Sequence, residues 1–152
     1  YTWEPTLLTD SKRDLAVKSE IEYALNYKLH EHLYWTNEPI EFIREYTQFY
    51  ITLFNLEWLH SANDRHNIAF NSNCCLSSVQ YNNGTLHAYS RSTDMRNGFH
   101  SDKRVLDYLA SHINEKRPDC TVNKICWYIA VPHVYLTKGI ARLLTDQEVD
   151  NV

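Results

Sequence analysis

Apolar residues recur every three to four positions in three stretches of the chain, which is the period of an amphipathic α-helix. The first stretch begins at Asp10 or Ser11 and carries the period to Leu33. The second covers residues 39–60 and opens on a proline, a residue well suited to the first turn of a helix. The third covers residues 101–115. These patterns predict three helices, each with one face in a hydrophobic core.

A different pattern, alternation of apolar and polar residues, marks the segment TVNKICWYIAV at residues 121–131. Alternation with period two is typical of a half-buried β-strand. The expected strand places Ile125, Trp127, Ile129 and Val131 on one face.

A β-hairpin is predicted within residues 73–95, where two strand-like runs flank the turn sequence Asn-Asn-Gly. A short helix is predicted over residues 138–144, whereas residues 1–9 have no period and are expected to be irregular. The order helix, helix, hairpin, helix, strand, helix predicts one α+β domain over residues 1–152, with an antiparallel component in its sheet.

Composition narrows the class of protein further. A chain of 152 residues with 43% hydrophobic residues is large enough for one domain with a real core. It has no run of about 18 apolar residues and opens on no secretion leader, so a soluble cytoplasmic protein without membrane contact is expected. The net charge of −4 gives little support to DNA binding, although a few arginines could hold a small anion.

The four cysteines have neither the C-x-x-C spacing of metal and redox motifs nor the even spacing of a disulfide framework. Reduced thiols are therefore expected. The chain also contains His60, His66 and His87, but their spacing from the thiols matches no zinc pattern, so no metal site is predicted.

The hairpin brings a thiol close to a guanidinium. With a three-residue loop at residues 82–84, Tyr81 faces Thr85 and Cys75 lies opposite Arg91, whereas a two-residue turn sets Cys75 opposite Ser92. A nearby guanidinium favours the reactive thiolate, and it could equally bind a phosphate together with Ser92. The alternative is a small core cysteine beside a solvated arginine.

The residues around this hairpin resemble those of the thymidylate synthase superfamily, which includes the deoxycytidylate hydroxymethylases. The family has a catalytic cysteine five residues before a glutamine, then an R-S-x-D segment with a glycine four residues later, then an H-x-Y segment after a strand. The resemblance covers roughly residues 67–136. The matching residues are Cys75, Gln80, Arg91, Ser92, Asp94, Gly98, His133 and Tyr135.

The resemblance implies a role for the residues of the hairpin and the segment after it. Cys75 would add to carbon 6 of a pyrimidine ring and make carbon 5 nucleophilic. Arg91 and Ser92 would hold the phosphate, with Arg91 also supporting the thiolate. Asp94 would orient the ring, and Gly98 would allow close approach.

The same resemblance assigns substrate contacts to residues further away. His133 and Tyr135 would contact the sugar hydroxyl, and Gln80 belongs to the substrate-binding set by its place in the motif. Arg65 stands where the family has arginines that reach the phosphate across a dimer interface. A homodimer is therefore expected.

The chain departs from the family at the position that reads the base. Four residues after the motif glycine the family has an asparagine that reads uracil, and here the residue is Asp102. Aspartate there resembles the cytosine-using hydroxymethylases, and a carboxylate can accept from the exocyclic amine of cytosine. The alternative is that Ser101 and Asp102 are a helix cap and a first-turn acid.

Other departures affect the thiol and the folate side. Leu76 replaces the histidine that commonly follows the catalytic cysteine, His100 replaces a proline, and Cys74 also replaces a proline, which makes it the alternate nucleophile. Glu57 and Trp58 are the candidates for the folate-side glutamate and tryptophan.

The resemblance implies a thymidylate-synthase-like fold and a covalent carbon-5 methyl or hydroxymethyl transfer to a pyrimidine deoxynucleotide monophosphate, with methylenetetrahydrofolate as the one-carbon donor. It favours dCMP over dUMP. Two alternatives stay open: an enzyme of the same superfamily that modifies pyrimidines in DNA, and a non-catalytic nucleotide-binding relative.

Overall fold

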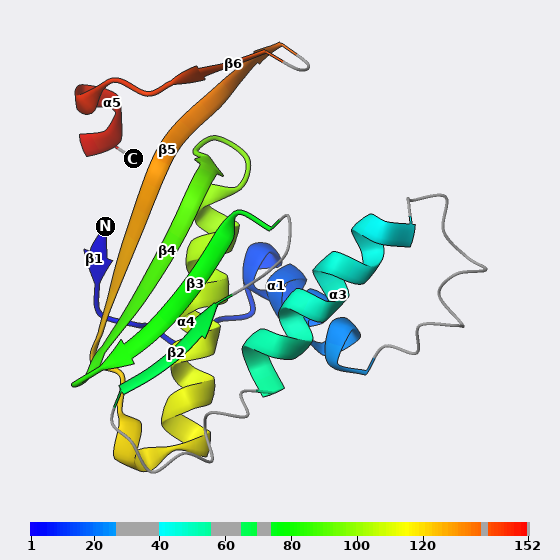
Figure 1. Cartoon of the computed structure of the whole chain (residues 1–152), viewed down its shortest axis with the longest axis vertical. Coiled ribbons are helices and arrows are strands. Elements are labelled where there is room, and N and C mark those ends of the chain that lie inside the picture. Colours follow the sequence, from blue (N-terminus) through cyan, green and yellow to red (C-terminus); the bar gives the residue numbers. More distant parts are fainter. Residues whose placement is uncertain (27–39, 56–64, 70–73, 138–139, 152) are drawn as a thin grey trace.

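In the computed structural model, a single mixed β-sheet forms the centre of the fold (Figure 1). The structure describes residues 1–26, 40–55, 65–69, 74–137 and 140–151. In chain order, the strands and helices of these segments are β1 (Thr2–Trp3), α1 (Lys12–Leu25), α3 (Ile40–Asn55), β2 (Arg65–Ala69), β3 (Leu76–Asn82), β4 (Thr85–Asp94), α4 (Phe99–Lys116), the 3-10 helix η2 (Pro118–Cys120), β5 (Lys124–Thr137), β6 (Ile140–Leu143) and α5 (Asp146–Asp150).

The six strands lie in the order β1-β5-β4-β3-β2, with β6 paired to β5 outside this path. Strands β4 and β5 are parallel and are joined through α4, whereas the other pairs are antiparallel. A parallel pair needs such a crossover, because a short turn cannot return the chain to the same end of the sheet. The prediction of an α+β domain with a mixed sheet is therefore consistent with the structure.

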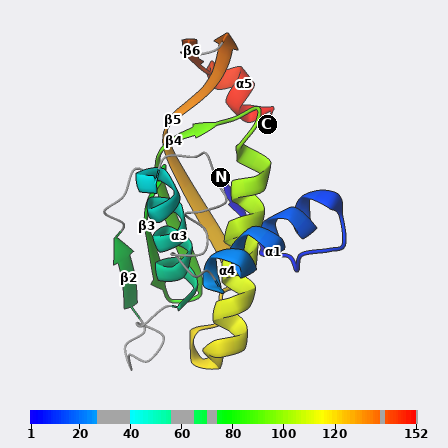
Figure 2. The same cartoon turned by 90° about the vertical axis from the view of Figure 1, so that its right-hand side faces the viewer.

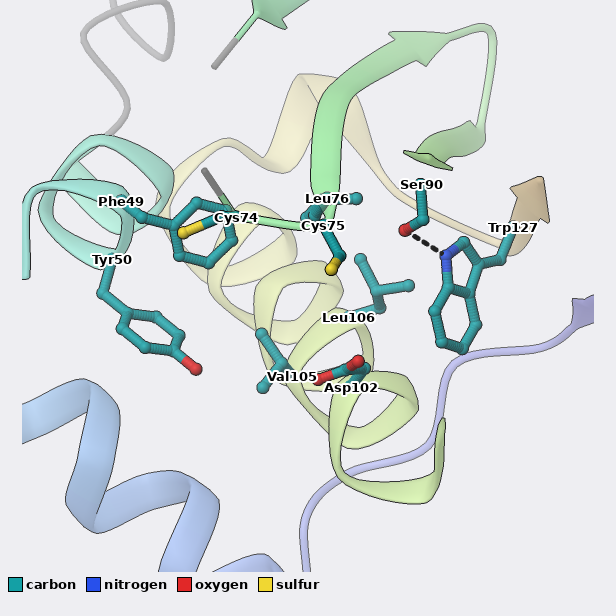
Figure 3. A pocket seen from close by; sticks show the side chains of 10 residues that line it. All are labelled: Phe49, Tyr50, Cys74, Cys75, Leu76, Ser90, Asp102, Val105, Leu106 and Trp127. Carbon is teal, nitrogen blue, oxygen red and sulfur yellow. Dashed lines mark hydrogen bonds between the residues drawn. The ribbon is translucent and has the colours of Figure 1, made fainter. Parts of the chain in front are cut away.

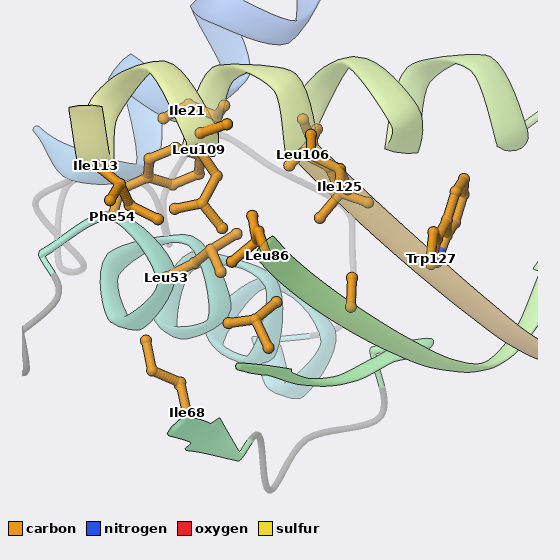
Figure 4. Packing of buried hydrophobic residues seen from close by; sticks show 14 of the residues in the cluster. Ile21, Leu53, Phe54, Ile68, Leu86, Leu106, Leu109, Ile113, Ile125 and Trp127 are labelled. Carbon is orange, nitrogen blue, oxygen red and sulfur yellow. The ribbon is translucent and has the colours of Figure 1, made fainter. Parts of the chain in front are cut away.

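The helices α1, α3 and α4 lie on one face of the sheet (Figures 1 and 2). Figure 4 shows the core between them, where Leu106 of α4 lies close to Ile125 of β5 and Leu109 lies near Ile21 of α1. Leu109 and Ile125 are fully buried. Burial of an aliphatic side chain contributes about 1.5–3 kcal/mol, so this face is the main source of stability.

The predicted helices are confirmed over most of the described residues, but α1 ends at Leu25, with Asn26 as its C-cap, before the expected end at Leu33. Ser11 caps α1, since its side chain accepts a hydrogen bond from the Asp14 backbone N–H at 3.2 Å. The described part of the second helix is α3, and the third helix is α4, which extends the predicted residues 101–115 by two residues at its start and one at its end. Leu33 and residues 56–60 lie outside the described residues.

The hairpin has a two-residue turn, so the predicted three-residue loop is wrong. Asn82 pairs with Thr85, and Asn83 and Gly84 between them both have positive φ, at 50° and 86°. This turn matches the right-handed twist of the strands, and asparagine tolerates the left-handed conformation. A register shift between Leu76 and Ser78 then adds one residue to β3.

The bulge in β3 restores the neighbours that the longer loop predicted. The Arg91 backbone N–H donates to the Cys75 carbonyl at 2.9 Å, so the two residues are main-chain partners despite the shorter turn. The predicted adjacency is present, but it results from a two-residue turn together with a bulge.

Both ends of the chain differ from the prediction. Residues 2–3, expected to be irregular, form β1 and pair with Cys126 and Ile125 on β5. The helix predicted over residues 138–144 is wrong, because residues 140–143 form β6, which pairs with the part of β5 from His133 to Thr137. β1 pairs with a strand distant in the sequence, and β6 pairs with the strand just before it. The apolar period of a segment does not report either pairing.

No helix in the described part of the chain is both long enough and apolar enough to cross a membrane.

Candidate functional site

A cavity of about 120 Å³ lies between the sheet and the helices α3 and α4 (Figure 3). It opens where β3 begins, and its wall combines aromatic rings, thiols and one carboxyl group. Its lining residues are Phe49, Tyr50, Cys74, Cys75, Leu76, Ser90, Asp102, Val105, Leu106 and Trp127.

Cys75 is the solvent-accessible thiol of this cavity. Its Sγ lies 3.5 Å from the Oγ of Ser92, while the half-buried Cys74 directs its sulfur toward Phe49 (Figure 3). Ser90 also lines the cavity, but its hydroxyl accepts a buried hydrogen bond from Trp127 Nε1 at 2.9 Å. The predicted residues Cys75 and Ser92 are therefore in contact, and Cys75 is the more accessible of the two adjacent thiols.

Arg91 contacts Cys75 through its main chain, but its side chain belongs to another surface. With Tyr89 and Tyr128 it lines an open depression of about 530 Å³. Tyr89 and Tyr128 are exposed and alternate along their strands with the buried Ser90 and Trp127, so the tyrosine rings lie on the opposite face of the sheet from the cavity. In this arrangement the thiol has the Ser92 hydroxyl beside it, and the Arg91 side chain lies across the sheet.

Two other predicted residues are distant from the cavity. Gln80 lies in the middle of β3, opposite His87 on β4. Arg65 begins β2 and pairs with Asn82, at the turn end of the hairpin. Cys75 lies at the other end of β3, so the backbone positions of Arg65 and Cys75 are separated by the length of the strand.

Asp94, Gly98 and His133 meet at the end of β4. The Asp94 carboxylate accepts from the backbone N–H groups of Arg96 and Asn97, both at 3.1 Å. Asp94 is also the register partner of His133 on β5. Burial by itself would raise the pKa of Asp94, but the hydrogen bonds from Asn97 and Arg96 and the nearby His133 outweigh it and lower that pKa.

Gly98 allows the chain to turn tightly from β4 into α4. A Cβ at this position would lie 3.3 Å from the Asp94 carbonyl oxygen and 3.6 Å from Asp102 Oδ2. Gly98 is the N-cap of α4, so the alternative in which Ser101 caps this helix is wrong. Further along β5, the rings of His133 and Tyr135 pack edge to face with centroids 5.2 Å apart, and neither residue lines the cavity.

Asp102 is the carboxyl group of the cavity and lies in the first turn of α4. The residue keeps access to solvent, but the protein atoms around its carboxyl group remove much of its hydration. This desolvation, together with the negative charges of Glu20 and Asp94, raises the pKa of Asp102 to about 6. Asp102 therefore changes its protonation state close to neutral pH.

Glu20 of α1 is the residue at this site that the sequence analysis did not identify. Burial raises its pKa, which a hydrogen bond with Tyr50, a lining residue of the cavity, partly offsets. Glu20 is three residues after the buried Val17 and one before the buried Ile21, so it borders the apolar face of its helix. An acid at the border of an apolar helix face can be recognised in the sequence. Its influence on Asp102 depends on how α1 packs in the folded protein.

Among the residues that the structure describes, no group of three or more His, Cys, Asp or Glu side chains could hold a metal ion. No protein-family model matches the chain, and neither a curated protein nor a solved structure matches it. The geometry of the cavity and the sequence resemblance are therefore the two grounds for inferring a function.

Proposed function

We propose that this chain is a thymidylate-synthase-like enzyme that transfers a one-carbon unit to carbon 5 of a pyrimidine deoxynucleotide monophosphate. The observation that carries the proposal is that an accessible thiol, Cys75, and a carboxyl group, Asp102, line the same cavity. A nucleophile and a base-reading acid on one cavity are what this chemistry requires. The volume of about 120 Å³ suits a single small ring, so the sugar and phosphate would lie outside it.

The first step is addition of the Cys75 sulfur to carbon 6 of the ring, which places the electron pair of the carbon 5–carbon 6 double bond on carbon 5, delocalised through carbon 4 onto N3 of cytosine or O4 of uracil. The Ser92 hydroxyl, 3.5 Å from the sulfur, can donate a hydrogen bond to the thiolate. This contact supports Ser92 as the neighbour that stabilises the nucleophile. Arg91 remains the proposed phosphate ligand. To bind the phosphate of a nucleotide whose ring is in the cavity, its side chain would have to pass around the edge of β4.

The base-reading group in this proposal is Asp102. Its ionised carboxylate accepts a hydrogen bond from the exocyclic amine of cytosine, whereas uracil presents a carbonyl oxygen at that position. Glu20 lies close enough to influence the charge of Asp102, so the two acids compete for protonation. The chemistry therefore favours dCMP over dUMP.

Methylenetetrahydrofolate is proposed as the one-carbon donor on the resemblance alone. The described cavity is smaller than the roughly 300–1,000 Å³ of a usual small-molecule site, and it does not fit a nucleotide and a folate together. The candidate folate-side residues Glu57 and Trp58 lie outside the described residues.

The proposal includes a homodimer formed through the open face of the sheet. Tyr89 and Tyr128 stack there with ring centroids 4.9 Å apart and are 38% and 49% exposed. The rings are nearly parallel and lie on neighbouring strands at paired positions, so they turn their faces to each other and their edges to solvent. Because the ring faces already cover each other, this surface is better suited to packing against another protein than to stacking a base.

Release of tritium from carbon 5 of labelled dCMP or dUMP tests the proposed chemistry directly. The wild-type chain should release label, and Cys75→Ala should reduce the rate by at least about a hundredfold, because exchange needs the covalent adduct. Cys74→Ala is the matched control, since it removes the adjacent thiol of the same cavity, and it should retain most of the exchange.

Equal slow release from wild type and Cys75→Ala would contradict the covalent mechanism. If the chain binds dCMP without any exchange of label, the non-catalytic nucleotide-binding alternative is correct instead. Loss of exchange in Cys74→Ala alone would identify the other thiol as the nucleophile.

A further inference from the structure

Ser90 is a polar residue on the buried face of β4. Leu86, Ala88 and Ser90 alternate along this strand with side chains of the open face, and their exposed fractions are 0%, 0% and 6%. The hydroxyl of Ser90 therefore continues a row of core residues. Burial of a hydroxyl costs stability unless its hydrogen bonds are made. The partners of this hydroxyl consequently decide what it contributes to the cavity that it lines.

The indole of Trp127 occupies one side of the Ser90 hydroxyl. Trp127 lies on β5 opposite Ala88, and its Nε1 donates to the Ser90 Oγ at 2.9 Å (Figure 3). The indole is held in place, because it stacks on Phe99 with centroids 5.2 Å apart and meets Trp3 edge to face at 6.4 Å. An indole nitrogen only donates, so Ser90 is the acceptor in this hydrogen bond.

The proton of the Ser90 hydroxyl has no acceptor among the described residues. A serine hydroxyl has one proton and two lone pairs, and the hydrogen bond from Trp127 uses one lone pair. The side chain of Ser90 makes no other hydrogen bond within the described part of the chain. Because Ser90 lines the cavity, a ligand bound there can accept this proton. The sheet wall of the cavity therefore offers a hydrogen-bond donor.

Asp102 offers the opposite group from α4, on the helix wall of the same cavity. An ionised carboxylate has no proton, so it can only accept a hydrogen bond. The donor and the acceptor border one space of about 120 Å³, which suits a single small ring. A ring that binds both groups must present a donor to Asp102 and an acceptor to Ser90.

Cytosine carries this pair of groups on neighbouring positions of its ring. Its N3 is an acceptor and its exocyclic N4 amine is a donor, whereas uracil presents the reverse pair, an N3–H donor and an O4 acceptor. We propose that the Ser90 hydroxyl donates to N3 of a cytosine ring whose N4 amine binds Asp102, so that the two residues together select cytosine over uracil. The inference rests on the proposed function in taking a pyrimidine nucleotide as the ligand.

The test is a cycle in which the protein and the ligand each lose one partner of this hydrogen bond. Ser90→Ala removes the hydroxyl, and the 3-deaza analogue of dCMP replaces N3 by a C–H group of nearly the same shape. Calorimetry at about pH 8, where Asp102 is ionised because its pKa is about 6, measures the four dissociation constants. Wild type should bind dCMP about tenfold more tightly than the analogue, and Ser90→Ala should bind the two equally.

A purely structural role of Ser90 predicts a different result. Ser90→Ala leaves the buried N–H of Trp127 without its acceptor, so a lower melting temperature is expected in either case. A loss of affinity that comes only from this damage weakens dCMP and the 3-deaza analogue by the same factor. An unchanged tenfold preference in folded Ser90→Ala would therefore overturn the proposal.

Ser111→Ala is the matched control, because it removes the hydroxyl of another partly buried serine, one that donates to the Asp107 carbonyl at 3.1 Å further along α4. It should keep the tenfold preference for dCMP over the analogue. If Ser90→Ala does not fold, Ser90→Cys takes its place in the cycle, since a thiol fills a similar volume but donates only weakly. Its preference should be well below that of wild type, and an equal preference would count against the proposal in the same way.

Dissociation constants require no turnover, so binding and catalysis are tested separately. The expected cycle without any tritium exchange would contradict the proposed catalysis and leave this inference in place. Exchange activity together with an unchanged preference in Ser90→Ala would contradict only this inference. A wild-type chain that binds neither dCMP nor its 3-deaza analogue would overturn the inference outright.

Discussion

Asp102 shows how a residue acquires its chemistry from its surroundings. Its ordinary pKa of 3.8 becomes about 6 through desolvation and the charges of Glu20 and Asp94. Because the folded-state pKa is raised, the carboxyl group favours the folded state most below about pH 4. That contribution is lost as the pH rises through about 6. The protein therefore keeps at its cavity an acid that ionises at a cost in stability, which is typical of a functional group.

The substitution Asp102→Asn is expected to shift the preference of the site from dCMP toward dUMP. An amide can donate to the carbonyl oxygen of uracil, whereas a carboxylate only accepts from the amine of cytosine. One paired base edge is worth about 1–3 kcal/mol, so the ratio of tritium-exchange rates should change by about tenfold or more. Competition between the two labelled nucleotides measures that ratio.

Asp146→Asn makes the same chemical change in an exposed residue of α5 and should leave the preference as it is. If Asp102→Asn also keeps the wild-type preference, this carboxylate does not read the base.

The β3–β4 hairpin shows how an element positions a side chain. Its two-residue turn shortens the loop relative to the prediction, and its bulge between Leu76 and Ser78 adds a residue back to the strand. The two effects cancel, so Cys75 accepts a backbone hydrogen bond from Arg91 at 2.9 Å. The turn itself depends on Gly84, whose φ is +86°.

The substitution Gly84→Ala should lower the free energy of unfolding by about 1 kcal/mol or more, as expected for a side chain forced into a positive φ. The added Cβ would also lie 3.0 Å from the Asn123 side-chain nitrogen. Urea denaturation measures the difference.

Asn83→Gly is the control within the same turn, because Asn83 has a φ of 50° that glycine adopts without strain. It should cost less than Gly84→Ala, about 0.4–1 kcal/mol, because glycine only adds conformational entropy to the unfolded chain. A Gly84→Ala variant as stable as wild type would show that the turn adapts without cost.

At the scale of the whole molecule, the sheet is covered by helices on one face (Figures 1 and 2). On its other face Tyr89 and Tyr128 are exposed. The cavity with Cys75 belongs to the covered face, and Arg91 belongs to the open one. A dimer through the open face would therefore place its interface on the other side of the same strands that form the proposed substrate site.

The substitution Tyr128→Lys should convert the proposed dimer to a monomer, because it places a charge at the centre of the stacked tyrosines. Sedimentation equilibrium measures the change, and circular dichroism checks that the fold is kept. Leu15→Lys is the control, since Leu15 of α1 is similarly exposed, at 47%, on another part of the surface. A wild-type chain that is monomeric at all concentrations would contradict the dimer.

The sequence by itself determined the features that depend on local periodicity. The apolar period predicted the helices α1, α3 and α4. The alternation at residues 121–131 predicted the first part of β5, from Lys124 to Val131. The family resemblance named Cys75 and Asp102, and the structure brings both to one cavity. The helix and strand predictions hold because the side chains of a helix or strand choose their face within a few residues of chain.

Only the tertiary structure decided the features that depend on pairing between elements. Strand β1 pairs with the distant β5, β6 pairs with the end of β5 just before it, and the bulge in β3 cancels the shorter turn. The packing of α1 on α4 brings Glu20 to Asp102, and the pleat of the sheet puts the Arg91 side chain on the open face. Each of these depends on the relative position of two elements, which no single stretch of sequence specifies.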